Sequence, residues 1–383
     1  MPRNRNDRPD PRMNGRRDYD EDDRRKKNGM NMKKIFGISF CIVLGIVVIS
    51  GAVIYRLGHD MYSSINYVAD EDVRTVETLP EAAMEETLST EERVGEVVSD
   101  EELNSIHSAM SSLSEIETVS DDDIYNVLLV GVDRRDDSWN GNSDSMILVS
   151  INKAKNKVSM VSLMRDTYVD IEGVGYAKLN AAYAYGAGPL LCSTVTDTFK
   201  VQVDRYAAVD FFDMVDIIDT IGGVTLEISP EEAEVANGYI MDMCNLQDED
   251  YSSHMIPSEG GTIYCDGYQA VGFARIRYVG NSDFERTERQ RYVITQLMAE
   301  VKQMSVAQMT EKMQAILGYV TMNIPETEIW RMITEVPEML DYEFETSRVP
   351  YDDMYDIIYV NGQDMLVPDW EPTLQKLQET IYG

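Results

Sequence analysis

The sequence predicts an α/β fold of the α+β sandwich type, in which helices cover a central mixed β-sheet, with a transmembrane helix near the N-terminus. Three observations support this prediction. Residues 35–55 form an apolar run without a charge, and residues 123–166 hold three apolar, β-branched runs of strand length. Helical patterns follow from residue 177. Strands that precede helices in this way are typical of a sheet covered by helical layers.

Charge is unevenly distributed along the 383 residues, whose formal net charge is −34. Arg and Lys are concentrated in residues 1–34, whereas acidic residues dominate after residue 57. Such acidity argues against nucleic-acid binding, which needs a basic surface to displace counterions. The three histidines, His59, His107 and His254, lie away from the motifs described below. A Ser-His-Asp, Cys-His or histidine-rich zinc site is therefore not expected.

Residues 35–56 are predicted to form an uncleaved membrane anchor. A helix over 35–55 would be about 30 Å long, which matches the hydrocarbon core of a bilayer. The run is too long for a signal peptide, and the small residues Ser50-Gly51-Ala52 lie inside it. Because the basic flank precedes the run, we expect residues 1–34 to be a disordered cytoplasmic tail. The rest of the chain is then extracellular, tethered to the cell membrane by a single span.

Residues 57–121 are predicted to be an acidic extracellular linker with a single proline, Pro80. Two interpretations fit equally: a solvated stalk of broken helices, or a disordered spacer. The folded domain is predicted over residues 122–383. Its motif core spans residues 125–300, and an extension of helices and strands spans residues 305–383.

Within this domain, strands are predicted at the runs DIYNVLLVGVD, SMILVSIN and KVSMVSLMRD. Asn156, between the last two, predicts a hairpin turn. Helices are predicted at 177–199 and 210–221, the second ended by Gly-Gly at 222–223, where the chain returns to a strand. A polar excursion then extends to about residue 264, and Asp266 is a predicted helix N-cap. Later helices are predicted at 283–303, 305–319 and 326–340, followed by short strands and a C-terminal helix.

Two of the four cysteines, Cys244 and Cys265, could form a disulfide in an oxidising compartment. Unpaired thiols fit the sequence equally well. No pair of cysteines has the CxxC spacing of a metal site.

Charged side chains lie at the ends of the predicted strands. Asp133 ends the first strand run, Asp144 precedes the second, and the pair Arg165 and Asp166 ends the third. Strand ends are exposed and well supported, so they often carry functional groups. Two aspartates 11 residues apart also fit turn and cap positions, so their spacing alone is weak evidence of a site.

A further group of charges lies in the stretch FARIRYVGNSDFERTERQR. Arg275 and Arg277 are two residues apart where a helix gives way to extended chain, so both guanidinium groups could face one target. On the next predicted helix, Asp283, Arg286 and Gln290 share one face.

The other charges of that helix are expected to pair with one another on its outer face. Glu285 and Arg289 are spaced i, i+4, and Glu288 and Arg291 are spaced i, i+3. A solvated charged helix therefore explains part of the stretch. It leaves the other arginines without acidic helical partners, and this concentration of arginine in an acidic chain favours an anion site.

Arginine suits phosphate because its planar guanidinium donates two hydrogen bonds at once and stays protonated. Mg²⁺ is commonly held by one or two carboxylates together with phosphate oxygens of the substrate. Arginines and a divalent ion together neutralise charge in phosphoryl transfer. The residue types therefore indicate a phosphate site with Asp133 and Asp144 as ligands of Mg²⁺, or of Mn²⁺ in its place.

Six stretches, in order and spacing, resemble the LytR-CpsA-Psr family of cell-wall glycopolymer ligases over about residues 125–300. They are NVLLVGVD, NSDSM, SLMRDT, KLNAAYAYG, VDFFDMVDIIDTIGGV and RIRYVGNSDFERTERQR. A basic tail, a single anchor and an outward-facing domain also fit the layout of that family. The resemblance implies a sheet between helices, with a hydrophobic pocket for a polyprenyl chain and a pyrophosphate with Mg²⁺ at its mouth.

The same resemblance assigns roles to individual residues. Asp133 and Asp144 correspond to metal-binding carboxylates, and Asp283 to a further active-site carboxylate near the metal or the arriving hydroxyl. The expected pyrophosphate ligands are Arg165, Lys178, Arg275, Arg277, Arg286 and Gln290. The expected catalytic set is Asp133, Arg165, Arg275, Arg277, Asp283 and Arg286.

The chain departs from the family pattern in three places. Asn142 stands where the family usually has arginine, two residues before the second aspartate, which puts one phosphate contact in doubt. Glu285 replaces a glycine, a change expected to be harmless because it points away from the Asp283–Arg286 face. SLMRDT lacks the proline of the family's SIPRDT but keeps Arg165.

The resemblance implies a phosphotransferase that moves an anionic glycopolymer, such as a teichoic acid or capsular polysaccharide, from a polyprenyl-pyrophosphate carrier to peptidoglycan. Three alternatives stay open. One is a non-catalytic protein that binds polyprenyl phosphate or has a structural role in the wall, and another is a pyrophosphate hydrolase. The third, a transcription regulator, is disfavoured because the short tail has no helix-turn-helix pattern.

The residues of the lipid pocket are not specified by the sequence. Phe211, Phe212, Met214, Ile217 and Ile218 are candidates because their predicted helix is apolar on more than one face. An ordinary core position is the favoured interpretation for each of them. The identity of the polymer and the oligomeric state are also left open.

Overall fold

The computed structural model describes residues 94–134, 138–277 and 282–383, together with Tyr62, residues 65–68, Val76, Leu79 and Val279. The predicted tail and anchor, residues 1–34 and 35–56, lie outside the described residues, so the single-span topology stays a prediction. No helix within the described ranges is long and apolar enough to cross a membrane.

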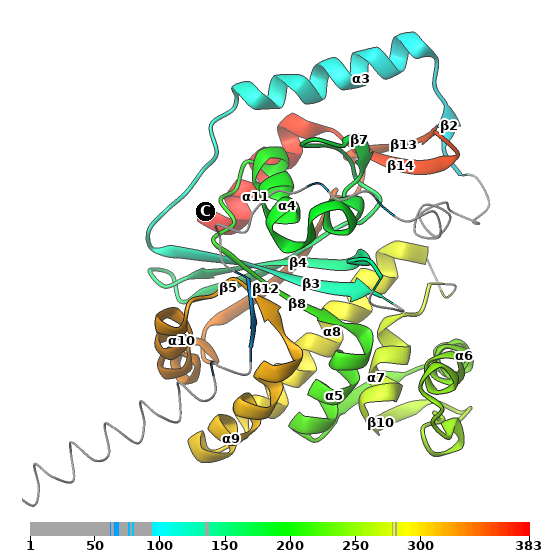
Figure 1. Cartoon of the computed structure of the whole chain (residues 1–383), viewed down its shortest axis with the longest axis vertical. Helices are drawn as coiled ribbons and strands as arrows, with labels where there is room; N and C mark the ends of the chain where they lie inside the picture. Colours follow the sequence, from blue (N-terminus) through cyan, green and yellow to red (C-terminus); the bar gives the residue numbers. More distant parts are fainter. Residues whose placement is uncertain are drawn as a thin grey trace, which may run out of the picture. The chain divides into compact units, whose positions relative to one another are not determined.

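A seven-stranded mixed sheet forms the centre of the fold (Figure 1). Its strands, in spatial order, are β1 (Asn66–Tyr67), β11 (Thr321–Met322), β8 (Arg205–Asp210), β3 (Ile124–Asp133), β4 (Asn142–Asn152), β5 (Lys157–Leu163) and β12 (Glu343–Val349). β3, β4 and β5 form an antiparallel meander. β8 runs parallel to β3, and β12 runs parallel to β5. The predicted mixed sheet is therefore confirmed.

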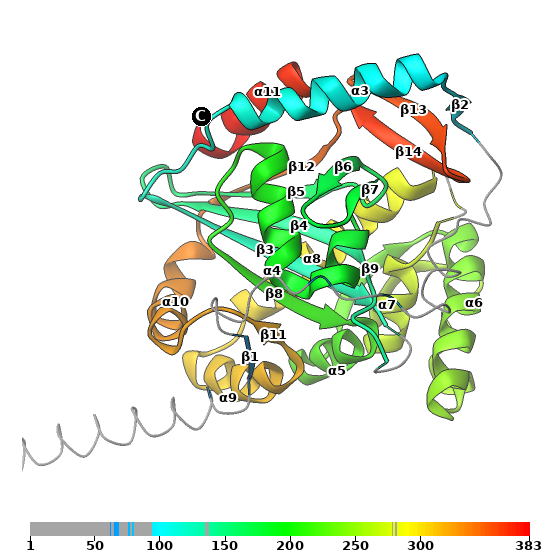
Figure 2. The same ribbon diagram turned by 45° about the horizontal axis from the view of Figure 1, so that its top comes forward.

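Helices cover both faces of this sheet (Figure 2). One face carries α4 (Ala181–Phe199) and α11 (Trp370–Tyr382), and the other carries α5 (Phe211–Ile221), α8 (Ser282–Lys302), α9 (Val306–Ile316) and α10 (Glu326–Met339). Successive strand residues point to opposite faces. Leu128 and Val130 accordingly lie in the core beneath α4 and α11, whereas Val127 and Ile147 pack against the opposite layer.

A smaller apolar core lies beside α5 and α8. It contains α6 (Pro230–Gln247), α7 (Gly267–Ala274) and the antiparallel pair β9 (Val224–Ile228) and β10 (Gly261–Cys265). The predicted polar excursion to residue 264 is therefore wrong. The capping box of Ser229 and Glu232, with Pro230 at the first helical position, starts α6. Cys244 and Cys265 both contribute free thiols to this core.

The helix predicted at 177–199 begins later than expected. Ala177 and Lys178 belong to β7 (Gly175–Lys178), which forms a hairpin with β6 (Tyr168–Ile171). α4 then starts at Ala181 and is kinked at Gly186 and Ala187, whose backbone angles are not helical. The predicted turn at Asn156 is confirmed, with a positive φ of 52°.

Part of the predicted linker packs on this domain. β2 (Glu96–Val97) pairs with β13 (Tyr355–Val360), which also pairs with β14 (Gln363–Pro368). α3 (Asp100–Ser112) and the short helix η1 (Leu113–Glu115) bury Met110 and Leu113 in the core beneath α4. These segments are therefore part of the folded unit, whose described residues all lie after residue 60.

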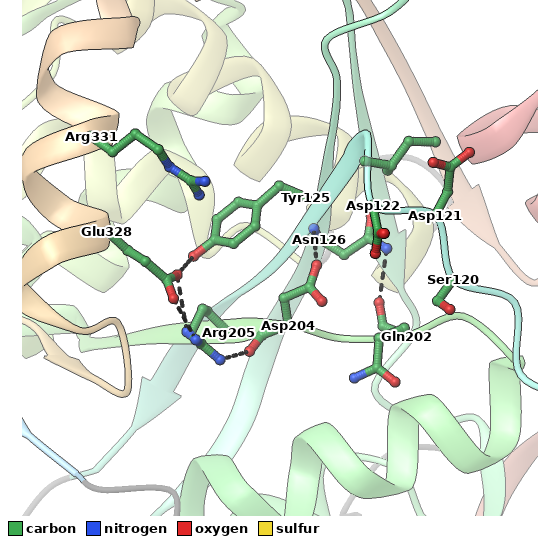
Figure 3. Close-up of a pocket in the computed structure, with 11 residues that line it drawn as sticks. Ser120, Asp121, Asp122, Tyr125, Asn126, Gln202, Asp204, Arg205, Glu328 and Arg331 are labelled. Carbon is green, nitrogen blue, oxygen red and sulfur yellow. Dashed lines mark hydrogen bonds and ion pairs between the residues drawn. The ribbon is translucent and has the colours of Figure 1, made fainter.

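At the start of β3, a polar cavity of about 280 Å³ opens beside α10 (Figure 3). A hydrogen-bonded triad joins the sheet to α10 here. The Tyr125 hydroxyl donates to Glu328 Oε2 over 2.6 Å. Arg205 donates to both Glu328 oxygens, to Oε1 over 2.5 Å and to Oε2 over 3.2 Å. A bidentate arginine–carboxylate contact fixes the orientation of the two side chains as well as balancing their charges. It therefore holds α10 in place against the sheet.

We expect Glu328→Ala to lower the free energy of unfolding by about 1–3 kcal/mol, since it leaves the half-buried Arg205 and Tyr125 without their shared acceptor. The measurement is urea unfolding of the full chain in detergent. Asp341→Ala is the matched control, because it removes an exposed ion pair with Lys302, with an expected change below about 0.5 kcal/mol. Equal effects of the two substitutions would contradict a structural role for the triad.

Candidate functional site

The meander brings three predicted site segments to one edge of the sheet. Asp133 ends β3, Asp144 lies near the start of β4, and Arg165 follows the end of β5. The ladder between β3 and β4 shifts register here: Gly131 pairs with Ser145, but the next residue pairs with Ser143. Asp144 is thus the extra residue of a β-bulge. Bulges re-aim side chains, which explains how Asp144 leaves the regular ladder.

Three arginines converge on Asp144. Arg165 donates to Oδ1 over 3.0 Å, and Arg277 donates to Oδ2 over 2.9 Å. Arg286 lies 3.6 Å from Oδ2 and also donates to the backbone oxygen of Asp144. The predicted convergence of arginines from the third strand end, the stretch after α7 and the helix α8 is therefore seen for these three side chains.

Burial and charge oppose each other at Asp144. Burial would raise the pKa of its carboxyl, but the guanidinium groups of Arg165, Arg286 and Arg277 outweigh burial and hold that pKa far below its usual range. Asp144 is therefore ionised throughout the physiological range. The Arg286 side chain is only 3% exposed, so an anion must balance its charge, and Asp144 supplies it.

Arg289 fixes the chain segment that carries Arg277. Its guanidinium donates to the backbone oxygens of Ile276 and Val279 and forms ion pairs with Glu285 and with Glu232 of α6. The expected pairing of Glu285 with Arg289 is confirmed, but its place on an outer face is wrong, because Arg289 is buried.

Arg291 is also buried rather than on the outer face, and it donates to Ser162 Oγ of β5 over 2.6 Å. Burial lowers the pKa of its guanidinium. No local pattern indicates Ser162 or Glu232 as partners, since each lies far from α8 along the chain.

Arg275 lies beside Asp133 rather than Asp144. Its Nη2 is 3.9 Å from Asp133 Oδ2, and its guanidinium stacks on the Phe211 and Tyr239 rings at 4.6 and 5.5 Å. Arg275 and Arg277 therefore contact adjacent carboxylates instead of one shared atom. The aromatic rings hold the guanidinium through cation–π attraction and leave its edge available for hydrogen bonding.

Lys178 and Asp166 extend the charged group on its other side. Lys178 Nζ lies 2.5 Å from Asp166 Oδ1, and Arg165 Nε lies 3.4 Å from Asp166 Oδ2. Burial would raise the pKa of Asp166, but Arg165 and Lys178 lower it below the usual range. Asp166 thus orients both cations, a role that was not predicted for it.

Two other predicted residues lie on α8. The side chain of Asp283 is outside the described part of the structure, so its role stays a prediction. Gln290 lies one helical turn after Arg286 and is half-buried.

The lipid-pocket candidates on α5 fall into two groups. Ile217 and Ile218 are buried core residues, whereas Phe211, Phe212 and Met214 are partly exposed.

The carboxylate of Asp133 is the group at this edge of the sheet that best fits a divalent ion. Among the described residues, no group of three or more His, Cys, Asp or Glu side chains is arranged to hold one. Both Asp144 oxygens are bound by arginines, but Asp133 Oδ1 is buried and makes no hydrogen bond to the described residues. Mg²⁺ usually keeps waters and substrate oxygens beside one or two carboxylates. Asp133 therefore fits such an ion, with substrate and water completing its coordination.

Acidic groups line the start of α5 near this edge. Asp210 caps the helix by accepting from the backbone N–H groups of Phe212 and Asp213, and Arg134 lies 3.4 Å from its Oδ2. Burial, together with the neighbouring Asp210 and Asp216, raises the pKa of Asp213 to about 6.

The raised pKa of Asp213 predicts a pH-dependent cost to stability. The folded state prefers protonated Asp213, so this group favours folding fully below its usual pKa of 3.8, and its contribution is lost as the pH rises through about 6. Asp213→Asn should raise the free energy of unfolding by about 1 kcal/mol at pH 8, with little effect at pH 4. Chemical unfolding at both pH values measures this, with the exposed Asp242→Asn as control. A gain that is equal at both pH values would contradict the assignment.

Comparisons with known proteins agree with this architecture. The LytR_cpsA_psr family profile matches residues 83–381. Biofilm regulatory protein A of Streptococcus mutans is 32% identical over 244 residues, which cover 59% of this chain and 55% of that protein. The polyisoprenyl-teichoic acid–peptidoglycan teichoic acid transferase TagU of Oceanobacillus iheyensis is 37% identical over 203 residues, which cover 51% of this chain and 57% of that protein. The matches thus span little more than half of these relatives.

A solved structure shares the fold. The family protein YwtF (TagT) with bound octaprenyl pyrophosphate aligns with a TM-score of 0.50 and 21% identity, over 68% of this chain and 92% of that one. The mixed sheet between helical layers is common to both. Since the family profile spans most of the sequence, this chain belongs to the LytR_cpsA_psr family.

Proposed function

We propose that this protein is a phosphotransferase that moves an anionic glycopolymer from a polyprenyl-pyrophosphate carrier to peptidoglycan. The observation that carries the proposal is the convergence of Arg165, Arg277 and Arg286 on one edge of the sheet, beside Asp133. The name of the relative TagU describes a teichoic acid transferase that acts on peptidoglycan, and the related TagT has bound octaprenyl pyrophosphate.

The charges of the site support an anionic substrate. Three carboxylates face five cationic side chains, which leaves a surplus of two positive charges; the group consists of Asp133, Asp144, Asp166, Arg165, Lys178, Arg275, Arg277 and Arg286. A pyrophosphate diester carries two negative charges, which this positive surplus would attract. The arginines are already held in place by Asp144, so little reorganisation is needed when phosphate oxygens arrive.

In the proposed reaction, a sugar hydroxyl of peptidoglycan attacks the phosphorus on the glycopolymer side of the pyrophosphate. A new phosphorus–oxygen bond forms, the bond to the bridging oxygen breaks, and polyprenyl phosphate leaves. The hydroxyl proton passes to a carboxylate, for which Asp283 is the candidate. Arg165, Arg277 and Arg286 stabilise the charge that develops on the phosphate oxygens. Asp133 would hold a divalent ion, which neutralises charge on the pyrophosphate.

The location follows from the same proposal. Peptidoglycan and the carrier lipid meet at the outer face of the cell membrane, which agrees with the predicted anchor and the predicted extracellular domain. The non-catalytic and regulatory alternatives differ from this proposal in one observable, since neither requires covalent attachment of polymer to the wall.

Arg277→Ala should lower the transfer rate by about 100-fold or more, because it removes a charge-bearing donor from the reacting phosphate. The assay follows polyprenyl phosphate release and polymer attachment, using a synthetic polyprenyl-pyrophosphate glycan and a peptidoglycan fragment. The exposed Lys302→Ala serves as control. Wild-type release without attachment would identify a hydrolase instead, and an unchanged rate in Arg277→Ala would reject the arginine site.

Asp133→Asn should remove the dependence of transfer on Mg²⁺, because the amide lacks the charge that holds a hard cation. The expected result is a loss of most activity that added Mg²⁺ does not restore. The measurement is the transfer rate against Mg²⁺ concentration for both proteins. Full activity of Asp133→Asn in the presence of a chelator would refute the proposed metal role.

A further inference from the structure

Two side-chain oxygens beside the arginine cluster are buried without a hydrogen-bond partner among the described residues. They are Asp133 Oδ1 and Asn142 Oδ1. A buried acceptor that lacks a partner destabilises the fold, so two in one place call for a physical explanation. Asp133 is the last residue of β3, and Asn142 is the first residue of β4.

The sheet places these two side chains together. Asp133 and Asn142 are direct partners in the antiparallel ladder. Directly opposed residues point to the same face, with their Cβ atoms roughly 5 Å apart. The pair lies next to Asp144 along β4, and Arg275 approaches Asp133 through Oδ2, the other oxygen. The two unbonded oxygens therefore belong to the edge of the proposed pyrophosphate site.

A divalent ion matches this pair of oxygens. Carboxylate and amide oxygens are hard ligands of the kind that Mg²⁺ and Mn²⁺ take. Arg165 and Arg277 contact the two Asp144 oxygens. The Asn142 oxygen, opposite Asp133, is instead a buried acceptor without a hydrogen bond to the described residues.

We propose that Asn142 binds the divalent ion through its amide oxygen, as a protein ligand beside Asp133. The inference rests on the proposed function, which supplies the cation. An arginine at this position would donate to phosphate and repel a metal, whereas the amide oxygen of Asn142 is an acceptor that a metal can use.

The experiment measures metal binding directly, without turnover. The full chain in detergent is titrated with Mn²⁺, and the loss of the free-ion electron paramagnetic resonance signal gives the dissociation constant. Asn142→Leu keeps the side-chain size but removes the oxygen, and should weaken Mn²⁺ binding by about tenfold. Asn142→Asp adds a charged oxygen and should tighten binding by about tenfold.

Asn142→Arg separates the two roles of this position. It should weaken Mn²⁺ binding, yet strengthen binding of inorganic pyrophosphate measured by calorimetry in a metal-free buffer. Asn126→Leu is the matched control, because Asn126 also has a buried oxygen without a hydrogen bond but lies at the opposite end of β3. Its Mn²⁺ dissociation constant should equal that of the wild type. Circular dichroism checks that each variant is folded.

The inference is overturned if all three Asn142 variants bind Mn²⁺ within twofold of the wild type while Asp133→Asn does not bind it. That result would leave the proposed transfer reaction intact, with the metal held by Asp133 and other ligands. It is also overturned if the wild type binds no Mn²⁺ with or without pyrophosphate. Failure of the proposed function looks different: Asn142 variants change Mn²⁺ affinity as expected, but no polymer becomes attached to peptidoglycan.

Discussion

The arrangement of the site depends on the carboxylate of Asp144. Three guanidinium groups from separate parts of the chain would repel one another, and one buried negative charge holds them together. The β-bulge at Asp144 makes this contact possible, because a regular ladder would give the side chain a different direction. In the proposed function, an incoming phosphate would therefore meet donors that are already oriented. Asp166 does the same for Lys178 on the neighbouring strand hairpin.

Much of the fold could be predicted because its signals are local. Apolar runs predicted β3, β4 and β5, and the N-cap residue Asp266 predicted the start of α7. The error at α6 arose because its buried positions, such as Ala233 and Ala236, are small and separated by polar residues. Its start signal, the capping box after β9, was present in the sequence. The late start of α4 depends on hairpin pairing between β6 and β7, which no local pattern specifies.

Less of the candidate site than of the fold could be predicted from the sequence. Residue types and the family resemblance selected the arginines, and their convergence agrees with that selection. Which acid each cation meets was not predictable, because Arg289 contacts Glu232 across 57 residues of sequence. The helix spacing suggested local pairs on an exposed face. Tertiary packing instead buried Arg289 and Arg291, where they fix the segment after α7 and the end of β5.

The long strand β3 connects two regions with separate tasks. Asp133 is its last residue. Tyr125, which belongs to the triad with Glu328 and Arg205, lies at its other end. With a rise of about 3.3 Å per residue, these ends lie roughly 25–30 Å apart. Substitutions at the Tyr125 end are therefore expected to change thermal tolerance with little effect on the side chains at the Asp133 end. The residues near α10 can then vary under selection for stability, independently of the charged residues around Asp133 and Asp144.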